Sequence, residues 1–222
     1  MGVCGPRGSG KTLYAVGRYI LPAMRAGLAV AAQIDVHDPR TAEHVRRLHD
    51  WADCLSVEDG WLLIDEAHRW APSREWFSLP ENARALWAQS RKYGLGMVLT
   101  FQHPGRIDRA MRELIDELYW IEPVKLAGRR TPYYRVWAVP LTQSLVTLGA
   151  LPDGGTKRLW RAPNDAYDAY DSWQEVDPPT SRVTLIDAQN VTRDAVRAEW
   201  RRMLARDRQR RRRAKLAEQQ TA

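Results

Sequence analysis

Gly5-Pro6-Arg7-Gly8-Ser9-Gly10-Lys11-Thr12 matches the phosphate-binding pattern G-x-x-x-x-G-K-[ST] at every fixed position. Its glycines allow backbone N–H groups to converge on the phosphates of a nucleotide, and the helix expected after them adds the positive end of its dipole. In such a loop we expect Lys11 to reach the β- and γ-phosphates and the Thr12 hydroxyl to coordinate Mg²⁺. A glycine-rich turn beside a surface lysine is the plain alternative. The apolar pair Val3-Cys4 before the loop and the helical pattern after it favour the binding loop, so the motif predicts a nucleoside triphosphate site.

A second motif, Trp61-Leu62-Leu63-Ile64-Asp65-Glu66, is a short apolar run that ends in two carboxylates. Such a run is typical of a strand buried on both faces of a parallel sheet, and α/β sheets bind ligands at the carboxyl ends of their strands. There we expect Asp65 to hold Mg²⁺, directly or through water, and Glu66 to orient and deprotonate an attacking water molecule. An acidic pair that starts an exposed helix is the structural alternative. The second carboxylate favours ATP hydrolysis over a GTPase or a small-molecule kinase.

The order of elements predicts an α/β P-loop NTPase with a mostly parallel sheet flanked by helices, because apolar runs alternate with helical segments of ten to fifteen residues. We predict helices at 12–26, 41–51, 81–93 and 107–118, and strands at 28–35, 61–65, 96–101 and 119–124. Pro22 is expected to kink or end the first helix, and Gly27 to close it. Further strands at 133–139 and 157–161, among Gly and Pro turns, predict a small β extension.

Four segments follow from this order: an ATPase core at 1–124, the β extension at 125–176, a linker containing proline at 177–192, and a basic helical tail at 193–222. The two cysteines show no metal-ligand spacing, which favours a reducing compartment. No apolar stretch approaches the roughly 18–20 residues that span a bilayer, and no signal peptide is recognisable. We therefore expect a cytoplasmic protein, with a peripheral position at the inner membrane or on the virion as alternatives.

The excess positive charge is confined to the tail. Of the 34 Lys and Arg and the 27 Asp and Glu in the chain, 11 and 4 lie at 193–222, so the remaining 23 of each sign balance. Such a segment attracts the phosphate backbone of DNA or an anionic membrane surface. A solvated helix that binds nothing specific is the alternative. The candidate contact residues are Arg208, Arg210, Arg211, Arg212, Arg213 and Lys215.

Two further residues are candidates for the catalytic step. Gln102 follows an apolar strand, where a neutral amide could sense the γ-phosphate or position water, unless it merely caps the next turn. Arg91 closes a helix, where the helix dipole alone would explain a cation; the functional alternative is a charge stabiliser that reaches a neighbouring subunit's nucleotide. Rival candidates for that arginine are Arg106, Arg109 and Arg112.

In order and content, these motifs resemble the Zot (zonular occludens toxin) domain. The phosphate loop and the acidic motif are each shared by many ATPases, but two segments together are more specific: Asp65-Glu66-Ala67-His68-Arg69 and, within Ser90-Arg91-Lys92-Tyr93-Gly94-Leu95, its last five residues. Leu99-Thr100-Phe101-Gln102 and residues 107–112 follow, and Tyr167-Asp168-Ala169-Tyr170-Asp171 resembles the end of the domain. The resemblance covers about residues 1–175.

The resemblance implies an ATPase core of the additional-strand, catalytic-glutamate type, in the FtsK/HerA class of motors, that works in virion morphogenesis. Carried over by motif, Lys11 and Thr12 bind nucleotide and Mg²⁺, Asp65 and Glu66 form the acidic pair, and Gln102 is the polar sensor. Filamentous phage assembly proteins of this family usually continue into a membrane span and a periplasmic part. The basic tail here departs from that pattern and is closer to the small packaging ATPases of membrane-containing double-stranded DNA viruses.

We therefore expect an ATP-hydrolysing motor that moves DNA during genome packaging or filament export. Its expected partners are further copies of itself in a ring, DNA, and phage capsid or coat proteins. Two other functions remain open: an ATP-binding adaptor that docks through its tail on DNA, coat protein or membrane, and a nucleotide or metabolite kinase. The acidic pair argues against the kinase, and turnover with and without DNA would separate all three.

Overall fold

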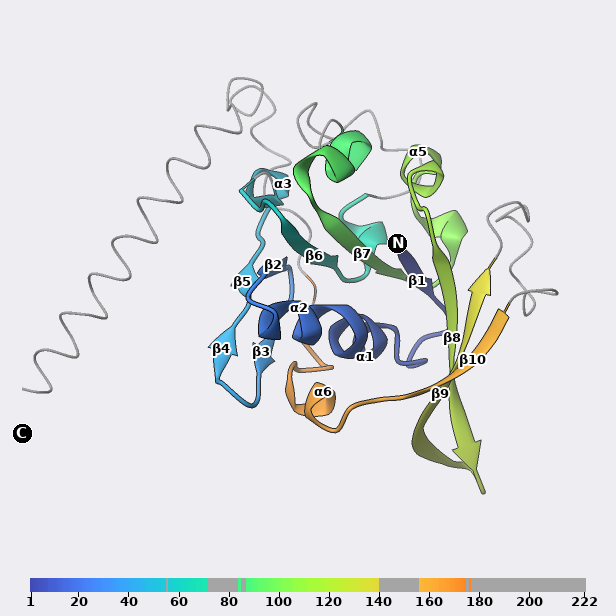
Figure 1. The fold of residues 1–222 in the computed structure, drawn as a ribbon. Helices are drawn as coiled ribbons and strands as arrows, with labels where there is room; N and C mark the ends of the chain where they lie inside the picture. Colours follow the sequence, from blue (N-terminus) through green and yellow to red (C-terminus); the bar gives the residue numbers. More distant parts are fainter. Residues whose placement is uncertain (55, 72–83, 85–86, 140–155, 175, 177–222) are drawn as a thin grey trace, which may run out of the picture.

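An eight-stranded sheet organises the chain (Figure 1). The computed structural model describes residues 1–54, 56–71, 84, 87–139, 156–174 and 176. The strand order is β10-β9-β8-β1-β7-β6-β2-β5, and neighbours from β8 to β5 are parallel while β9 and β10 are antiparallel. The strands are β1 (Gly2–Cys4), β2 (Ala29–Ala32), β5 (Arg46–Arg47), β6 (Gly60–Ile64), β7 (Gly96–Phe101), β8 (Leu118–Leu126), β9 (Arg129–Val139) and β10 (Thr156–Arg161). The predicted mostly parallel sheet is confirmed.

The central strands β1, β7 and β6 are buried on both faces, as their uninterrupted apolar sequences predict. β7 lies between β1, which leads into the phosphate loop, and β6, which leads into the acidic pair. It is therefore the additional strand that the resemblance implies. Because all three strands are parallel, the loop, the acidic pair and Gln102 emerge at the same edge of the sheet.

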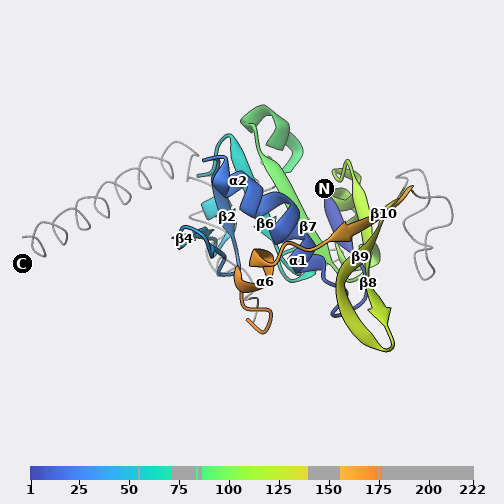
Figure 2. The ribbon, with the colours of Figure 1, turned by 60° about the horizontal axis from the view of Figure 1, so that its bottom comes forward.

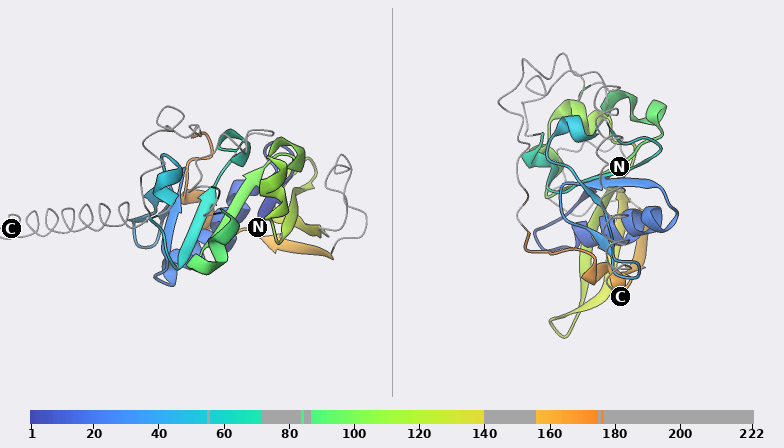
Figure 3. Two further views of the ribbon diagram at one scale, coloured as in Figure 1. Left: turned by 90° about the horizontal axis from the view of Figure 1, so that it is seen from above. Right: turned by 90° about the vertical axis from the view of Figure 1, so that its left-hand side faces the viewer.

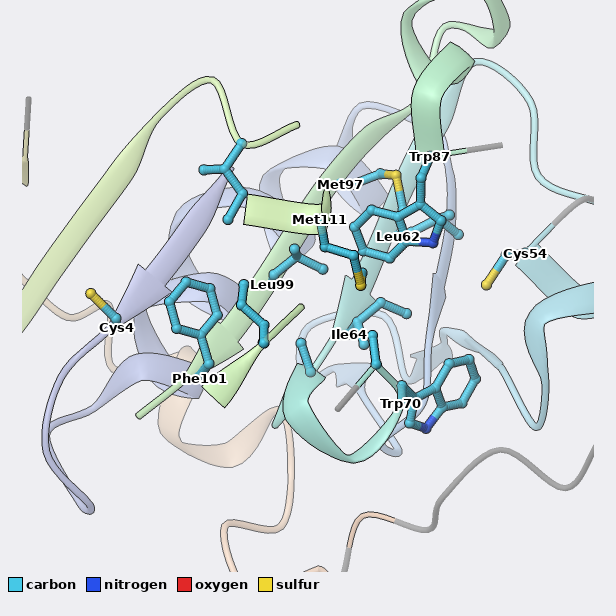
Figure 4. Packing of buried hydrophobic residues seen from close by; sticks show 14 of the residues in the cluster. Cys4, Cys54, Leu62, Ile64, Trp70, Trp87, Met97, Leu99, Phe101 and Met111 are labelled. Atoms are coloured by element: carbon cyan, nitrogen blue, oxygen red, sulfur yellow. The ribbon is translucent and has the colours of Figure 1, made fainter. Parts of the chain in front are cut away.

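Helices cover both faces of the sheet (Figures 1 and 3). On one face lies a helical run made of α1 (Lys11–Ala15), a π-helical turn (Val16–Ile20) and α2 (Leu21–Arg25). Its apolar side chains share a core with Val3, Leu63 and Val98 of the sheet. α3 (Trp51–Cys54) and α5 (Arg109–Glu113) lie on the other face. Figure 4 shows the second core there, in which Leu62, Ile64, Leu99 and Phe101 of the sheet gather with Trp70, Trp87 and Met111.

The first helical run ends as predicted, but Pro22 does not stop it. The π-helical turn directly precedes α2, and the helical run continues through Pro22, the second residue of α2. Gly27 has a φ of 72°, and Leu28 N donates to Ala23 O at 3.0 Å across the helix end. Such a left-handed glycine closes a helix by satisfying its last carbonyls.

The helix predicted over residues 41–51 is wrong. This segment forms two short strands, β4 (Glu43–His44) and β5, and helix begins only at Trp51. β4 pairs with β3 (His37–Asp38). β5 pairs with β2, and Leu48 N extends that pairing by donating to Ala32 O at 2.7 Å. These backbone hydrogen bonds stabilise the strands more than the amphipathic pattern stabilises a helix, because tertiary pairing overrides a weak helix propensity.

Two other predicted helices are shorter in the structure. Over residues 107–118 the chain is helical only in α5 and enters β8 at Leu118, which pairs with Gly2. Over residues 81–93, residue 84 and residues 87–89 are helical and η4 (Ser90–Tyr93) is a 3-10 turn, while 81–83 and 85–86 lie outside the described residues. Gly94, with a φ of 61°, ends this segment as predicted.

The predicted β extension continues the main sheet. β8 pairs with β1 along its first residues and with β9 along its whole length, so it spans the expected boundary at residue 124. After β10 the chain returns past α6 (Asp165–Asp168), where Ala166 packs against Gly17 of the first helical run (Figure 2). The expected linker at 177–192 and tail at 193–222 lie outside the described residues. In the part of the chain that the structure describes, no helix is both long and apolar enough to cross a membrane.

Candidate nucleotide-binding site

The phosphate loop requires its glycines. Gly5, Gly8 and Gly10 have φ values of 147°, 70° and 91°, which side chains rarely tolerate. A Cβ on Gly5 would lie 2.5 Å from the Ile121 carbonyl oxygen, and one on Gly10 would lie 2.5 Å from Tyr134 Cε1. The loop is thus held closely against β8 and β9. Pro6, Arg7 and Gly8 form its exposed outer part.

Inside the loop, two polar side chains are buried. Lys11 is only 8% exposed, and its Nζ donates to Pro6 O at 3.1 Å, across the mouth of the loop. Burial lowers the pKa of the Lys11 ammonium, and the charges of Asp65 and Glu66 oppose this effect. Ser9 Oγ is buried without a hydrogen-bond partner among the described residues. A buried ammonium and an unpaired hydroxyl inside a glycine cradle fit the phosphates of a nucleotide.

Thr12 and Asp65 meet beside the loop. Thr12 stands in the first turn of α1, and Asp65 follows β6 directly. Thr12 Oγ1 donates to Asp65 Oδ1 at 2.8 Å, and Thr100 Oγ1 donates to the same oxygen at 2.5 Å. This meeting follows from the register, because β7 places Leu99 opposite Ile64 and Thr100 opposite Val3. A hydroxyl and a carboxylate beside phosphate oxygens are the donor set that suits Mg²⁺.

Asp65 is nearly fully buried. Burial raises the pKa of the Asp65 carboxyl, while the hydrogen bonds from Thr100 and Thr12 and the charge of Lys11 oppose this rise. The acidic pair therefore does not start an exposed helix, which was the structural alternative. A cation bound here would favour the charged form of the carboxylate.

Glu66 turns away from the strand that precedes it. Its backbone is left-handed, with φ 46° and ψ 49°, and its N–H donates to Thr100 Oγ1 at 3.0 Å. The side chain is 37% exposed, and its Oε2 lies 3.8 Å from His68 Nε2. Burial lowers the pKa of His68, and the charge of Glu66 opposes this. The Glu66 carboxylate thus lies at the loop edge of the sheet, open to solvent, next to a carboxylate that is not.

The remaining candidate residues divide between the two edges of the sheet. Gln102 follows β7 directly and is half-buried, so it belongs to the loop edge. Arg106 in η5 (Pro104–Arg106) belongs there too, because its charge is close enough to help lower the pKa of His68. Arg91 stands in η4, ahead of β7, at the opposite edge. The six residues of β7 separate Arg91 from the site by about 20 Å. The side chains of Arg91 and Arg109 lie outside the described parts, and Arg112 lies in α5 with a buried Nε.

Two site residues were not singled out from the sequence. Thr100 holds both acidic residues, because it donates to Asp65 and accepts from the backbone of Glu66. Gln33, only 3% exposed, donates from Nε2 to Asp65 O at 2.7 Å, and its Oε1 has no partner within the described chain. Each polar residue comes at the end of an apolar strand sequence, which is the signal that identified Gln102. The proposed tail contacts at 208–215 lie outside the described residues.

The family comparison matches most of the chain. The sequence profile of the zonular occludens toxin (Zot) family matches residues 3–175. This range includes the phosphate loop, the acidic pair and all three strands β8, β9 and β10. No curated protein sequence matches the chain significantly.

Solved structures provide two further comparisons. The crystal structure of the N-terminal domain of zonular occludens toxin from Neisseria meningitidis matches with a TM-score of 0.53 and 16% identity, covering 77% of this chain and 97% of that domain. At this identity the likeness concerns the fold. The genome packaging NTPase B204 from Sulfolobus turreted icosahedral virus 2, in complex with ATP-gammaS, gives a TM-score of 0.46 and 11% identity, covering 73% of this chain and 96% of that one.

Proposed function

The chain belongs to the zonular occludens toxin (Zot) family, and from this premise we propose that it is an ATPase whose hydrolysis of ATP drives the assembly of phage particles. The observation that carries the proposal is the 2.8 Å contact between Thr12 and Asp65. It joins the phosphate loop to the acidic strand end, two motifs that are 53 residues apart in the chain.

Each residue at the loop edge can have its own role in ATP hydrolysis. The loop N–H groups and Lys11 hold the phosphates of ATP, and Thr12 and Asp65 are the residues that would hold Mg²⁺. Mg²⁺, when bound, neutralises phosphate charge that builds up during transfer. Glu66 accepts a proton from water, the water oxygen bonds to the γ-phosphorus, and the bond to the β-γ bridging oxygen breaks, so that ADP and phosphate leave. The partly exposed, left-handed position of Glu66 leaves its carboxylate accessible to that water.

We further propose that several copies form a ring and move DNA. In such a ring an arginine of one subunit would stabilise the phosphates bound by its neighbour. Arg91 fits this role, because its place at the opposite edge of the sheet prevents it from serving its own site. The basic tail would contact DNA phosphates or an anionic membrane in the cytoplasm of the host.

Measured ATP turnover tests the proposal. Purified wild-type protein should release phosphate from ATP with Mg²⁺ present, and DNA should increase the rate if the protein is a motor. Glu66→Gln should retain ATP binding and lose at least about 100-fold in turnover, since it removes the general base. Lys11→Ala should weaken both binding and turnover.

Glu43→Gln on β4 is the matched control, because it makes the same change on an exposed residue. Turnover of Glu66→Gln equal to that of this control would remove Glu66 from the mechanism. ATP binding without turnover in the wild type would indicate the adaptor, and phosphate transfer to a small-molecule acceptor would indicate the kinase.

A further inference from the structure

The β8–β9 hairpin runs along the outside of the phosphate loop and projects beyond the helices (Figures 1 and 2). β8 is nine residues long, whereas its partner β1 has three, so the hairpin continues past the end of β1. Ala127 and Gly128 form its two-residue turn with φ values of 49° and 78°. Two positive φ values are typical of the turns that match the twist of a hairpin and set its register. That register pairs Lys125 with Arg130 and Leu126 with Arg129.

Three residues of the hairpin touch the loop. The Ile121 carbonyl lies against Gly5, the Tyr134 ring lies against Gly10, and Arg130 Nη2 lies 3.1 Å from where a Cβ of Gly8 would be. The first two contacts are buried, and they fix the distance between hairpin and loop. Arg130 is exposed and so is Gly8, so the guanidinium stands at the open side of the loop.

Among the residues that the structure describes, none pairs an acidic side chain with the guanidinium of Arg130. Across the described parts of the chain, no carboxylate forms an ion pair or hydrogen bond with it, although Arg25, Arg40 and Arg47 each form one with an aspartate. A guanidinium presents several N–H donors in a planar fork that fits phosphate oxygens, and it binds them more strongly than neutral donors do. An unpaired guanidinium beside a phosphate-binding loop is therefore placed to receive a phosphate.

We propose that Arg130 binds the polyphosphate of the nucleotide, so that the β8–β9 hairpin forms one wall of the nucleotide site. The loop itself contributes Lys11 from inside, and Arg130 contributes a second cation from outside. This inference rests on the proposed function, since it needs a nucleotide in the loop. It adds a residue that none of the sequence motifs contains.

Nucleotide affinity measured by calorimetry tests the proposal on the full-length protein, with a non-hydrolysable ATP analogue and Mg²⁺. Arg130→Ala should raise the Kd about tenfold, as expected for losing a charge-assisted hydrogen bond. Arg130→Lys should recover part of the loss, because it keeps the charge without the fork. The Kd of inorganic tripolyphosphate, measured directly, should rise in Arg130→Ala by a similar factor.

Arg129→Ala is the matched control, because Arg129 is the adjacent exposed arginine of the same hairpin and points to the opposite face of the strand. It should change the Kd less than twofold, and the unfolding temperatures of both nucleotide-free variants should equal that of the wild type. Equal losses in the two variants, or an unchanged Kd in Arg130→Ala, would overturn the role of Arg130 while leaving the ATPase proposal intact. A wild-type protein that binds no nucleotide would overturn both proposals. Lys11→Ala serves as the reference variant, because its Kd shows how far affinity falls when the loop itself is impaired.

Discussion

Asp65 is buried between the hydroxyls of Thr12 and Thr100 and beside the ammonium of Lys11. Burial disfavours the charged carboxylate more than these neighbours favour it, so its pKa is raised. With its pKa raised, the ionised form of this carboxyl at neutral pH costs the nucleotide-free protein stability. Functional sites commonly keep such groups at the expense of stability.

Asp65→Asn should therefore stabilise the nucleotide-free protein at pH 7 while abolishing ATP hydrolysis. The raised pKa means that the native state binds this proton more readily than the unfolded state, so wild-type stability falls as pH rises through that pKa. Asparagine keeps the shape without the charge. We expect the unfolding temperature to rise by about 2–4 °C, the effect of 1 kcal/mol in a chain of this size.

Thermal unfolding followed by circular dichroism at pH 7 and at lower pH is the measurement. The advantage of Asp65→Asn should shrink as pH falls, because the wild-type carboxyl becomes protonated. A lower unfolding temperature for the variant at pH 7 would mean that Lys11 and the two hydroxyls compensate fully for the burial.

At the scale of elements, the parallel strands sort the candidate residues. β1, β6 and β7 deliver the phosphate loop, the acidic pair and Gln102 to one edge, and η4 with Arg91 stays at the other. Neighbouring subunits in a ring can bring opposite edges together, whereas one chain cannot. Arg106, in contrast, lies at the loop edge of its own chain.

Mixing two inactive variants tests this arrangement. Arg91→Ala should lower turnover by about 10³-fold or more, the usual effect of removing an arginine that acts on a neighbour's nucleotide. Glu66→Gln should be inactive for a different reason, because it removes the general base from the subunit's own site. In a mixture, a Glu66→Gln subunit can supply its Arg91 to an intact Glu66 of the Arg91→Ala variant, so part of the activity should return.

Light scattering alongside the turnover measurement gives the oligomeric state, and wild-type turnover per chain should rise with concentration. Full activity from a strictly monomeric species, or a mixture that stays inactive, would exclude an Arg91 that acts between subunits. Arg106→Ala then becomes the variant to compare, since that arginine can reach the site within one chain.

At the scale of the whole molecule, the excess positive charge and the candidate nucleotide site lie in different segments of the sequence. Residues 1–192 carry equal numbers of acidic and basic side chains, and the net charge of +7 lies at 193–222. Among the described residues, those of the candidate nucleotide site lie between residues 5 and 134, within the sheet and its loops. A tail with this net positive charge attracts anionic polymers such as DNA.

Deleting residues 193–222 should lower DNA affinity and leave basal ATP turnover unchanged. On duplex DNA, the slope of log K against log salt should flatten by about 0.9 for each phosphate contact removed. Fluorescence anisotropy over a salt series gives this slope, and anionic liposomes provide the counter-test. Unchanged DNA binding with lost liposome binding would assign the tail to a membrane surface, where each basic residue contributes about 1 kcal/mol.

Local sequence was sufficient for the parts of this protein that depend on local chemistry. The phosphate loop could be predicted because its glycines, Lys11 and Thr12 are contiguous, and the buried strands because their apolar runs are uninterrupted. The resemblance to the Zot family rested on the same short motifs and is confirmed over residues 3–175. The roles of Glu66, Gln102, Arg91 and the tail remain predictions.

Tertiary contacts decided the rest. Residues 41–51 have a helical pattern but form strands, because β2 offers backbone partners that the pattern cannot reveal. Thr100 and Gln33 reach Asp65 only through strand register, and Arg130 lies beside Gly8 only because the hairpin folds back along the loop. Residues that are far apart in the chain become neighbours when strands pair, and a single sequence does not record which strands will pair.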